Sequence, residues 1–158
     1  MCLKKYIAFI VMLIMVQSCN TIDVYEKTAA LPKHEWQSSN SFSFSFDVKD
    51  TSAYYNIYFV LRHTESYHFN NIWIDFTSIL PDKKKQTQRL NIQLTNLKND
   101  GWLGTSMDDI IEQRLLINKQ PIRLQKGSYT FIIQQIMRED PLTNILNAGI
   151  RVEKVSPQ

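Results

Sequence analysis

The residues best suited to chemistry in this chain are His63, Glu65 and His68, which fall within six positions of one another. Imidazole and carboxylate groups are ordinary zinc ligands, and on a strand His63 and Glu65 would share one face. His68 falls in the polar loop that follows, so the spacing does not force the three side chains to converge. We expect these residues to form hydrogen bonds in a loop, with a metal site as the alternative.

Asp108 and Asp109 form the second candidate, because paired carboxylates can share proton-transfer work. Adjacent residues point apart in a helix and in a strand, so the two groups would not face each other. Ser106 with Asp109 three residues later is typical of a helix N-terminus, which predicts one capped helical turn here. No nucleophile elbow, phosphate loop or dinucleotide motif is found, and the chain has only four glycines. We predict no enzyme activity, no metal and no cofactor.

Aromatic side chains on a sheet face could stack on sugar rings. The candidates are Tyr54, Tyr58, Trp73 and Trp102. Packing in the core or between strands explains such residues more often than a glycan does. A carbohydrate-binding β-sandwich lipoprotein is therefore the alternative function.

The first eighteen residues are typical of a lipoprotein signal peptide. Lys4 and Lys5 precede an apolar run over 6–16, which is shorter than the roughly 20 residues of a membrane-spanning helix. Val16-Gln17-Ser18-Cys19 then resembles the bacterial lipobox, in which cleavage precedes the cysteine. We predict that Cys19 carries a thioether-linked lipid and palmitate-type acylation of the new amino group, so that the lipid bilayer is a partner. An uncleaved anchor and an ordinary signal peptide are the alternatives.

Composition excludes several classes of protein. The 158 residues suffice for one domain with a proper core, and 44% hydrophobic with 21% charged residues argues against disorder of the whole chain. Both cysteines lie in the first nineteen residues, so the body can form no internal disulfide and no thiolate metal site. The net charge of +3 includes Lys4 and Lys5 of the signal peptide. The remainder is nearly neutral, which predicts no nucleic-acid binding.

The body of the chain repeats one pattern, an apolar residue at every second position, which predicts strands with one buried face. The centre is 54–77, where two such strands flank the polar loop His63–Asn71. Alternation recurs at 41–48, 88–94, 128–137 and 146–152. We predict a single all-β domain, an antiparallel β-sandwich of jelly-roll or Ig-like type with about seven or eight strands, over residues 41–158. Residues 1–18 are assigned to the signal peptide and 19–40 to a lipidated tether and lead-in, in which Val24-Tyr25 could add an edge strand.

The lysine run at 83–85 follows Pro81-Asp82, a turn signal. We predict a solvated hairpin tip here, with a patch for lipid or polyanions as the alternative.

Taken together, the chain resembles the gliding-motility lipoproteins of the GldH type, found in Bacteroidetes. The resemblance spans nearly the whole mature chain in one order. It rests on Cys19, Tyr25-Glu26-Lys27, Trp36, Tyr55-Asn56-Ile57-Tyr58, Leu61-Arg62-His63-Thr64, Tyr67, Asn70-Asn71-Ile72-Trp73, Thr87-Gln88-Arg89-Leu90, Gly101-Trp102-Leu103-Gly104 and Met107-Asp108-Asp109-Ile110.

This resemblance implies a role in surface gliding or the linked envelope machinery, without catalytic residues. We expect a non-catalytic binding or scaffolding lipoprotein of the bacterial cell envelope, in the outer membrane or at the cell surface rather than in the inner membrane. Its expected partners are envelope or motility proteins, with a glycan as the alternative. Loops on a rigid sandwich usually carry function, so the candidate binding residues come from the loops His63–Asn71 and Gly101–Ile110. They are His63, Tyr67, Asn70, Asn71, Trp102, Asp108 and Asp109.

Overall fold

The computed structural model describes residues 24–96, 98 and 101–155, so the predicted signal peptide and Cys19 lie outside the described residues. Strands and short turns make up this part of the chain, and every strand pairing is antiparallel. The prediction of an all-β antiparallel sandwich is confirmed. Among the described residues, eight strands have seven or more residues and four have two or three.

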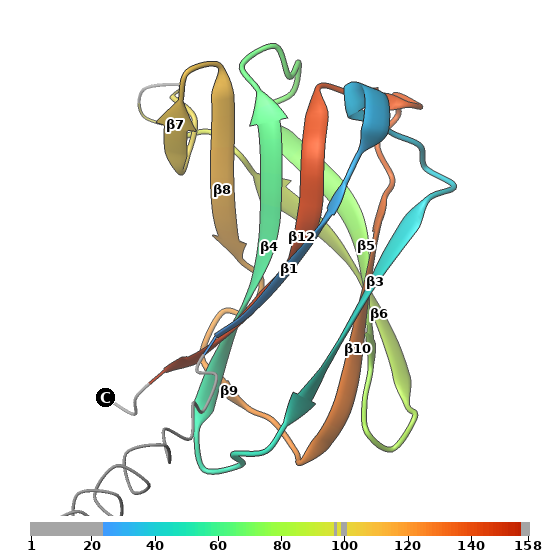
Figure 1. Cartoon of the computed structure of the whole chain (residues 1–158), viewed down its shortest axis with the longest axis vertical. Helices are drawn as coiled ribbons and strands as arrows, with labels where there is room; N and C mark the ends of the chain where they lie inside the picture. The colour runs from blue at the N-terminus through green and yellow to red at the C-terminus, as the bar shows by residue number, and fades with distance from the viewer. Residues whose placement is uncertain (1–23, 97, 99–100, 156–158) are drawn as a thin grey trace, which may run out of the picture.

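Two sheets form the layers of the sandwich (Figure 1). The first has the order β1-β12-β4-β8-β7, with β9 also paired to β4, and the second has the order β3-β10-β5-β6. The strands of the first sheet are β1 (Val24–Ala30), β4 (Tyr54–Thr64), β7 (Thr105–Met107), β8 (Ile110–Leu116), β9 (Ile122–Arg123) and β12 (Ile145–Val155). Those of the second are β3 (Ser41–Val48), β5 (Asn71–Ile79), β6 (Lys85–Gln93) and β10 (Gly127–Gln135). A 3-10 turn η1 (Pro32–His34) and the pair β2 (Glu35–Trp36) and β11 (Leu142–Thr143) complete the chain.

Alternation in the sequence builds the core between the layers. On β4 the side chains of Ile57, Phe59 and Leu61 are all buried, as the spacing predicted. Phe131 of β10 is the centre of the opposite layer, with its ring centroid 5.1 Å from that of Phe46 and 5.0 Å from that of Phe76. Burying such side chains contributes roughly 1.5–3 kcal/mol each. Packing between the two inner faces therefore supplies most of the stability of this fold.

The strand β1 falls inside the range 19–40 assigned to the tether and lead-in, and it pairs with β12 over seven positions from Val24 to Ala30. Its close approach requires a glycine at position 149. A Cβ there would collide with the carbonyl oxygen of Lys27 and with Thr28. The sandwich thus already includes Val24–Ala30, ahead of the boundary expected at residue 41.

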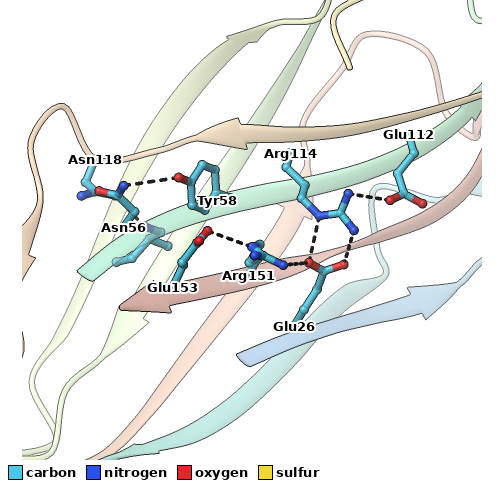
Figure 2. A network of polar contacts seen from close by, with 9 residues as sticks. Glu26, Asn56, Tyr58, Glu112, Arg114, Asn118, Arg151 and Glu153 are labelled. Carbon is cyan, nitrogen blue, oxygen red and sulfur yellow. Dashed lines mark hydrogen bonds and ion pairs between the residues drawn. The ribbon is translucent and has the colours of Figure 1, made fainter. Parts of the chain in front are cut away.

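An ion-pair network on the outer face of the first sheet also holds β1 (Figure 2). Arg114 of β8 donates two hydrogen bonds to the Glu26 carboxylate of β1, each 2.9 Å. The register places Val60 of β4 and Gly149 of β12 between these strands, so the Arg114 side chain spans two strands. Arg151 donates to the same carboxylate at 2.8 Å. These arginines keep the pKa of Glu26 below its usual range.

Two ends of the sandwich can be distinguished (Figure 1). We call the end where β1 begins the tether end; it comprises residues 47–54, 80–86, 117–128 and 153–155. The opposite end is called the far end; its loops are 31–40, 64–70, 94–104, 107–109 and 136–144. Strand pairing brings the tether-end segments together: Val24 pairs with Glu153, Val155 with Tyr54, and Tyr54 with Arg123. All the candidate binding residues lie at the far end.

Candidate functional site

A cluster of rings forms the base of the far end. His63 is the penultimate residue of β4 and is fully buried, with its ring centroid 4.5 Å from that of Trp102 and 5.3 Å from that of Tyr67. Tyr67 is also buried, and its hydroxyl donates to the carbonyl oxygen of Asn71 at 3.1 Å. Two of the candidate binding residues, His63 and Tyr67, therefore face the core and offer a partner no surface in this structure.

The local chemistry of His63 favours the neutral ring. Its Nδ1–H donates to the carbonyl oxygen of Thr64 at 2.8 Å, which leaves Nε2 as the bare nitrogen. That Nε2 is buried without a hydrogen-bond partner. Burial lowers the pKa of His63, and the bond to Thr64 opposes this only in part. An uncharged imidazole packed on an indole serves structure here.

The segment after β6 closes this cluster from the other sheet. The carbonyl oxygen of Leu94 accepts from Leu103 N–H at 2.8 Å and from the buried Gln113 side chain at 2.9 Å. Gly104 follows with φ +95°, where a Cβ would collide with the carbonyl oxygen of Glu112. Only glycine allows both the positive φ and the close approach to Glu112, because residues with a Cβ disfavour positive φ. These contacts place Trp102 over His63.

The predicted helical turn at 106–109 is wrong. Thr105–Met107 is the short strand β7, which pairs with β8: Met107 lies opposite Ile110, and Thr105 lies opposite Glu112. Asp108, in the turn between the two strands, has a φ of 54°. Aspartate tolerates this left-handed conformation, so the residue types that cap a helix suit a tight hairpin equally well. The carbonyl oxygen of Asp109 accepts from Glu65 N–H at 3.0 Å, which joins this turn to the loop 64–70.

A shallow hollow of about 520 Å³ opens beside this loop. It is lined by Phe69, Asn71, Trp73, Arg89, Ile136, Met137 and Arg138. Trp73 is 39% exposed, and the Arg138 guanidinium lies 5.5 Å from the centre of the Phe69 ring. Arg89 is committed to Asp75, with Nε 3.1 Å from the carboxylate. Rings, a methionine and a guanidinium packed on a ring form a wall suited to contact rather than to proton transfer.

Phe69, which lines the hollow, contacts the buried Tyr67 at a centroid distance of 5.8 Å, so the hollow adjoins the ring cluster. Met107 at the turn is 75% exposed, the largest exposed fraction among the large apolar side chains described. We use the name far-end surface for these residues of the hollow and of the turn together: Phe69, Asn71, Trp73, Met107, Asp108, Asp109, Met137 and Arg138.

Of the other candidate binding residues, Asn71, Asp108 and Asp109 are part of this surface. Asn70 is exposed in the loop, where its carbonyl oxygen accepts from Leu94 N–H at 2.8 Å. Trp102 is partly buried against His63. Phe69, Met137 and Arg138 were not candidates from the sequence, because three separate segments meet to make the hollow and no local pattern indicates it.

The metal alternative at His63, Glu65 and His68 has no geometric support. His63 is buried and His68 is exposed. Within residues 24–96, 98 and 101–155, no three His, Cys, Asp or Glu side chains gather in a way that could hold an ion. The same part of the chain contains no helix long and apolar enough to cross a membrane.

The comparisons with known proteins give the family. Residues 23–152 match the model of the GldH lipoprotein family. A gliding motility lipoprotein GldH homolog from Christiangramia forsetii is 27% identical over 153 residues, covering 92% of this chain and 93% of its own. The gliding motility lipoprotein GldH of Flavobacterium johnsoniae is 28% identical over 149 residues, covering 89% and 91%.

Among solved structures, the subviral particle of infectious bursal disease virus VP2 is similar over 84% of this chain and 32% of that one, with 18% identity and a TM-score of 0.36. This likeness is slight and bears on neither fold detail nor function. The family match covers most of the described sandwich and agrees in extent with both curated relatives. The chain belongs to the GldH lipoprotein family.

Proposed function

We propose that the mature chain is a non-catalytic envelope lipoprotein, anchored through acylated Cys19, whose far-end surface binds a protein of the gliding-motility or associated envelope machinery. One observation supports the binding role above the others. The exposed Met107, the acidic turn at Asp108–Asp109 and the hollow beside Trp73 all lie at the far end of the sandwich. Apolar and aromatic anchors beside polar neighbours are the usual composition of interface hot spots.

The anchor supports the same proposal. Membership of a lipoprotein family agrees with the Val16-Gln17-Ser18-Cys19 pattern, and several acyl chains hold a protein on a membrane far more firmly than one. We propose the outer membrane or the cell surface as its location. Mass spectrometry of the mature N-terminus tests the modification: acyl chains on Cys19 are expected, and a free or unprocessed terminus contradicts it.

A crosslinking pull-down from native envelopes tests the binding surface. The test variant is Met107→Ser with Asp108→Asn and Asp109→Asn, three exposed positions. Because these side chains are outside the core, the unfolding temperature should stay nearly unchanged. Recovery of motility or envelope proteins should fall at least about tenfold, the effect of one modest hot spot.

The matched control is Leu116→Ser with Asp47→Asn, which makes the same kinds of change at exposed positions elsewhere. Tyr67 is unsuitable as a probe, because truncating a buried ring would destabilise the domain. If the test variant recovers the same proteins as the control, the far-end surface is not the binding site.

The hollow supports a second candidate, a glycan ligand. Trp73 and Phe69 present rings in a shallow, open site, and Arg138 and Asn71 provide polar groups at its wall. Tyr54 and Tyr58 lie on the other sheet, so they cannot join this site. Retention of the purified protein on a polysaccharide column, lost in Trp73→Ala, would favour the glycan over the protein partner.

A further inference from the structure

The short chain between the anchor and the sandwich confines the tether end near the membrane. β1 begins at Val24, five residues after Cys19. A fully extended chain spans at most about 3.5 Å per residue, so Val24 lies within about 17 Å of the Cys19 backbone. The eleven-residue strand β4 runs between the two ends and is about 35 Å long. The tether is therefore shorter than the domain that it holds.

Basic side chains gather at this confined end. The tether end contains eight basic and four acidic residues. Two of the lysines are committed: Lys84 lies 2.9 Å from Asp82, and Lys154 lies 2.8 Å from Asp50. The other six form no ion pair with the described residues; they are Lys49, Lys83, Lys85, Lys119, Arg123 and Lys126.

These six cations come from segments that the fold brings together. Lys49 and Lys126 flank the paired residues Val48 and Gly127 of β3 and β10. A Cβ on Gly127 would meet Pro81 of the β5–β6 hairpin, so the lysine-bearing tip lies against the same edge. Lys119 and Arg123 come from the connection through β9, which pairs with the start of β4. The six cations thus come from three separate stretches of sequence at one end of the sandwich.

The same surface carries side chains typical of a lipid–water boundary. Ile122 is 38% exposed, beside the pairing of Arg123 with Tyr54. The Arg123 guanidinium lies 4.9 Å from the centre of the Tyr54 ring. Aromatic rings with a polar tip and long basic side chains favour the headgroup layer of a membrane. There the apolar part of each side chain contacts lipid while its polar end contacts headgroups and water.

The opposite end has the opposite charge. Its described loops contain six acidic residues and three basic ones. An anionic lipid surface would attract the tether end and repel the far end. The end with the net positive charge is therefore the end nearer the proposed lipid anchor.

We infer that the tether end is a docking surface for anionic lipid headgroups, which holds the sandwich upright with its far-end surface directed away from the membrane. The inference rests on the proposed anchoring at Cys19. It adds an orientation that anchoring alone does not give, since attachment at a single point would leave the domain free to rotate. The lipids are recognised by their negative charge.

Fluorescence quenching on vesicles tests this orientation. The mature chain has no cysteine beyond Cys19, so Thr51→Cys labels the tether end and Ser66→Cys the far end, both at exposed positions. The acylated protein is reconstituted in vesicles of phosphatidylcholine with phosphatidylglycerol, containing a lipid with a nitroxide headgroup. The label at 51 should be quenched strongly and the label at 66 weakly. In vesicles of phosphatidylcholine alone, this difference should shrink.

Charge variants link the orientation to the basic surface. Each lysine near an anionic membrane favours the docked state about fivefold, so Lys119→Gln with Lys126→Gln should lower the ratio of docked to undocked protein about thirtyfold. The matched control, Lys33→Gln with Lys98→Gln at the far end, should leave it unchanged. Raising the salt from 0.1 M to 1 M shortens the screening length from about 10 Å to about 3 Å and should also reduce the quenching at 51.

The outcomes separate the inference from the anchor. Acylated protein that floats with the vesicles but shows equal quenching at both labels overturns the inference alone. So does a difference that persists in the Lys119→Gln, Lys126→Gln variant, because the charges would then have no part in it. Protein that carries no acyl chain and does not float overturns the anchor and the inference together.

Discussion

The two ends of the sandwich both expose a large apolar side chain next to charged neighbours, but with opposite sign. At the far end Met107 lies beside Asp108 and Asp109, and at the tether end Ile122 lies beside Arg123. The support beneath them also differs. His63 and Trp102 pack on each other beneath the far end, whereas backbone pairing, a surface ion pair and the buried Tyr129, whose hydroxyl accepts from Gln125 N–H, organise the tether end. The far end thus depends on packing for its shape, and the proposed docking of the tether end on lipid depends on charge.

Truncation of one large apolar residue at each end should show this contrast most strongly. Trp102→Ala removes a partly buried ring from the side of His63 and should cost about 3 kcal/mol of the free energy of unfolding, near the lower limit for such changes. Ile122→Ala removes a solvent-facing side chain and should cost no more than about 0.5 kcal/mol. Denaturant titration measures both. Equal costs would mean that the ring cluster is not what supports the far end.

Breaking the ion-pair network should have a smaller effect. Glu26→Gln leaves Arg114 and Arg151 without their shared carboxylate and should cost about 1 kcal/mol at neutral pH, because the network is only partly shielded from water. Glu153→Gln removes a partner of Arg151 alone and should cost less.

The effect of Glu26→Gln on the free energy of unfolding should depend on pH, because the pKa of Glu26 is lowered in the folded protein. A carboxyl group whose pKa is lowered by folding stabilises the protein at pH values above its pKa in the unfolded chain. This contribution is lost as the pH falls through its pKa in the folded protein. The gap in unfolding free energy between wild type and Glu26→Gln should therefore close in acid. A gap that stays constant with pH would show that the substitution acts through packing.

The smallest expected effect is the pH response of the far end. Burial lowers the pKa of His63, so the folded protein binds its proton less readily than the unfolded chain does. Stability should be complete above the ordinary histidine pKa of about 6.5 and should decline as the pH falls through it. The unfolding temperature should show this decline, and His63→Gln should reduce it. The exposed His68→Gln is the control, and an equal reduction there would assign the effect elsewhere.

The main strands could be predicted because burial on one face leaves a mark at every second residue. Phe44 and Phe46 of β3, or Phe131 and Ile133 of β10, are buried as their spacing indicates. β1 gave a weaker signal, because it is an edge strand whose central residues Glu26, Lys27 and Thr28 are polar. Its position is set by Gly149 and Arg114, both far away along the chain.

The far end was harder to predict, because its side chains are positioned by contacts between loops. A polar loop containing histidine and tyrosine indicates exposure, yet His63 and Tyr67 are buried by Trp102, which arrives from the segment after β6. Ser106 and Asp109 illustrate a different limit, since the same residue types suit a helix cap and a hairpin turn. Only pairing with β8 decides between them.

The pairing of β1 with β12 has a mechanical consequence for a protein that is held at one end. Val24 is the first described residue after Cys19, the proposed attachment point, and β1 runs from there along the edge of the sheet. A force applied at Val24 along this strand pulls it in shear, so that all seven paired positions resist together instead of opening one after another. The Glu26 carboxylate, two residues after Val24, also binds Arg151 of β12 and Arg114 of β8, which adds a lateral link to a further strand. With the proposed anchor at Cys19, traction on the domain would act on the strand geometry that best resists it.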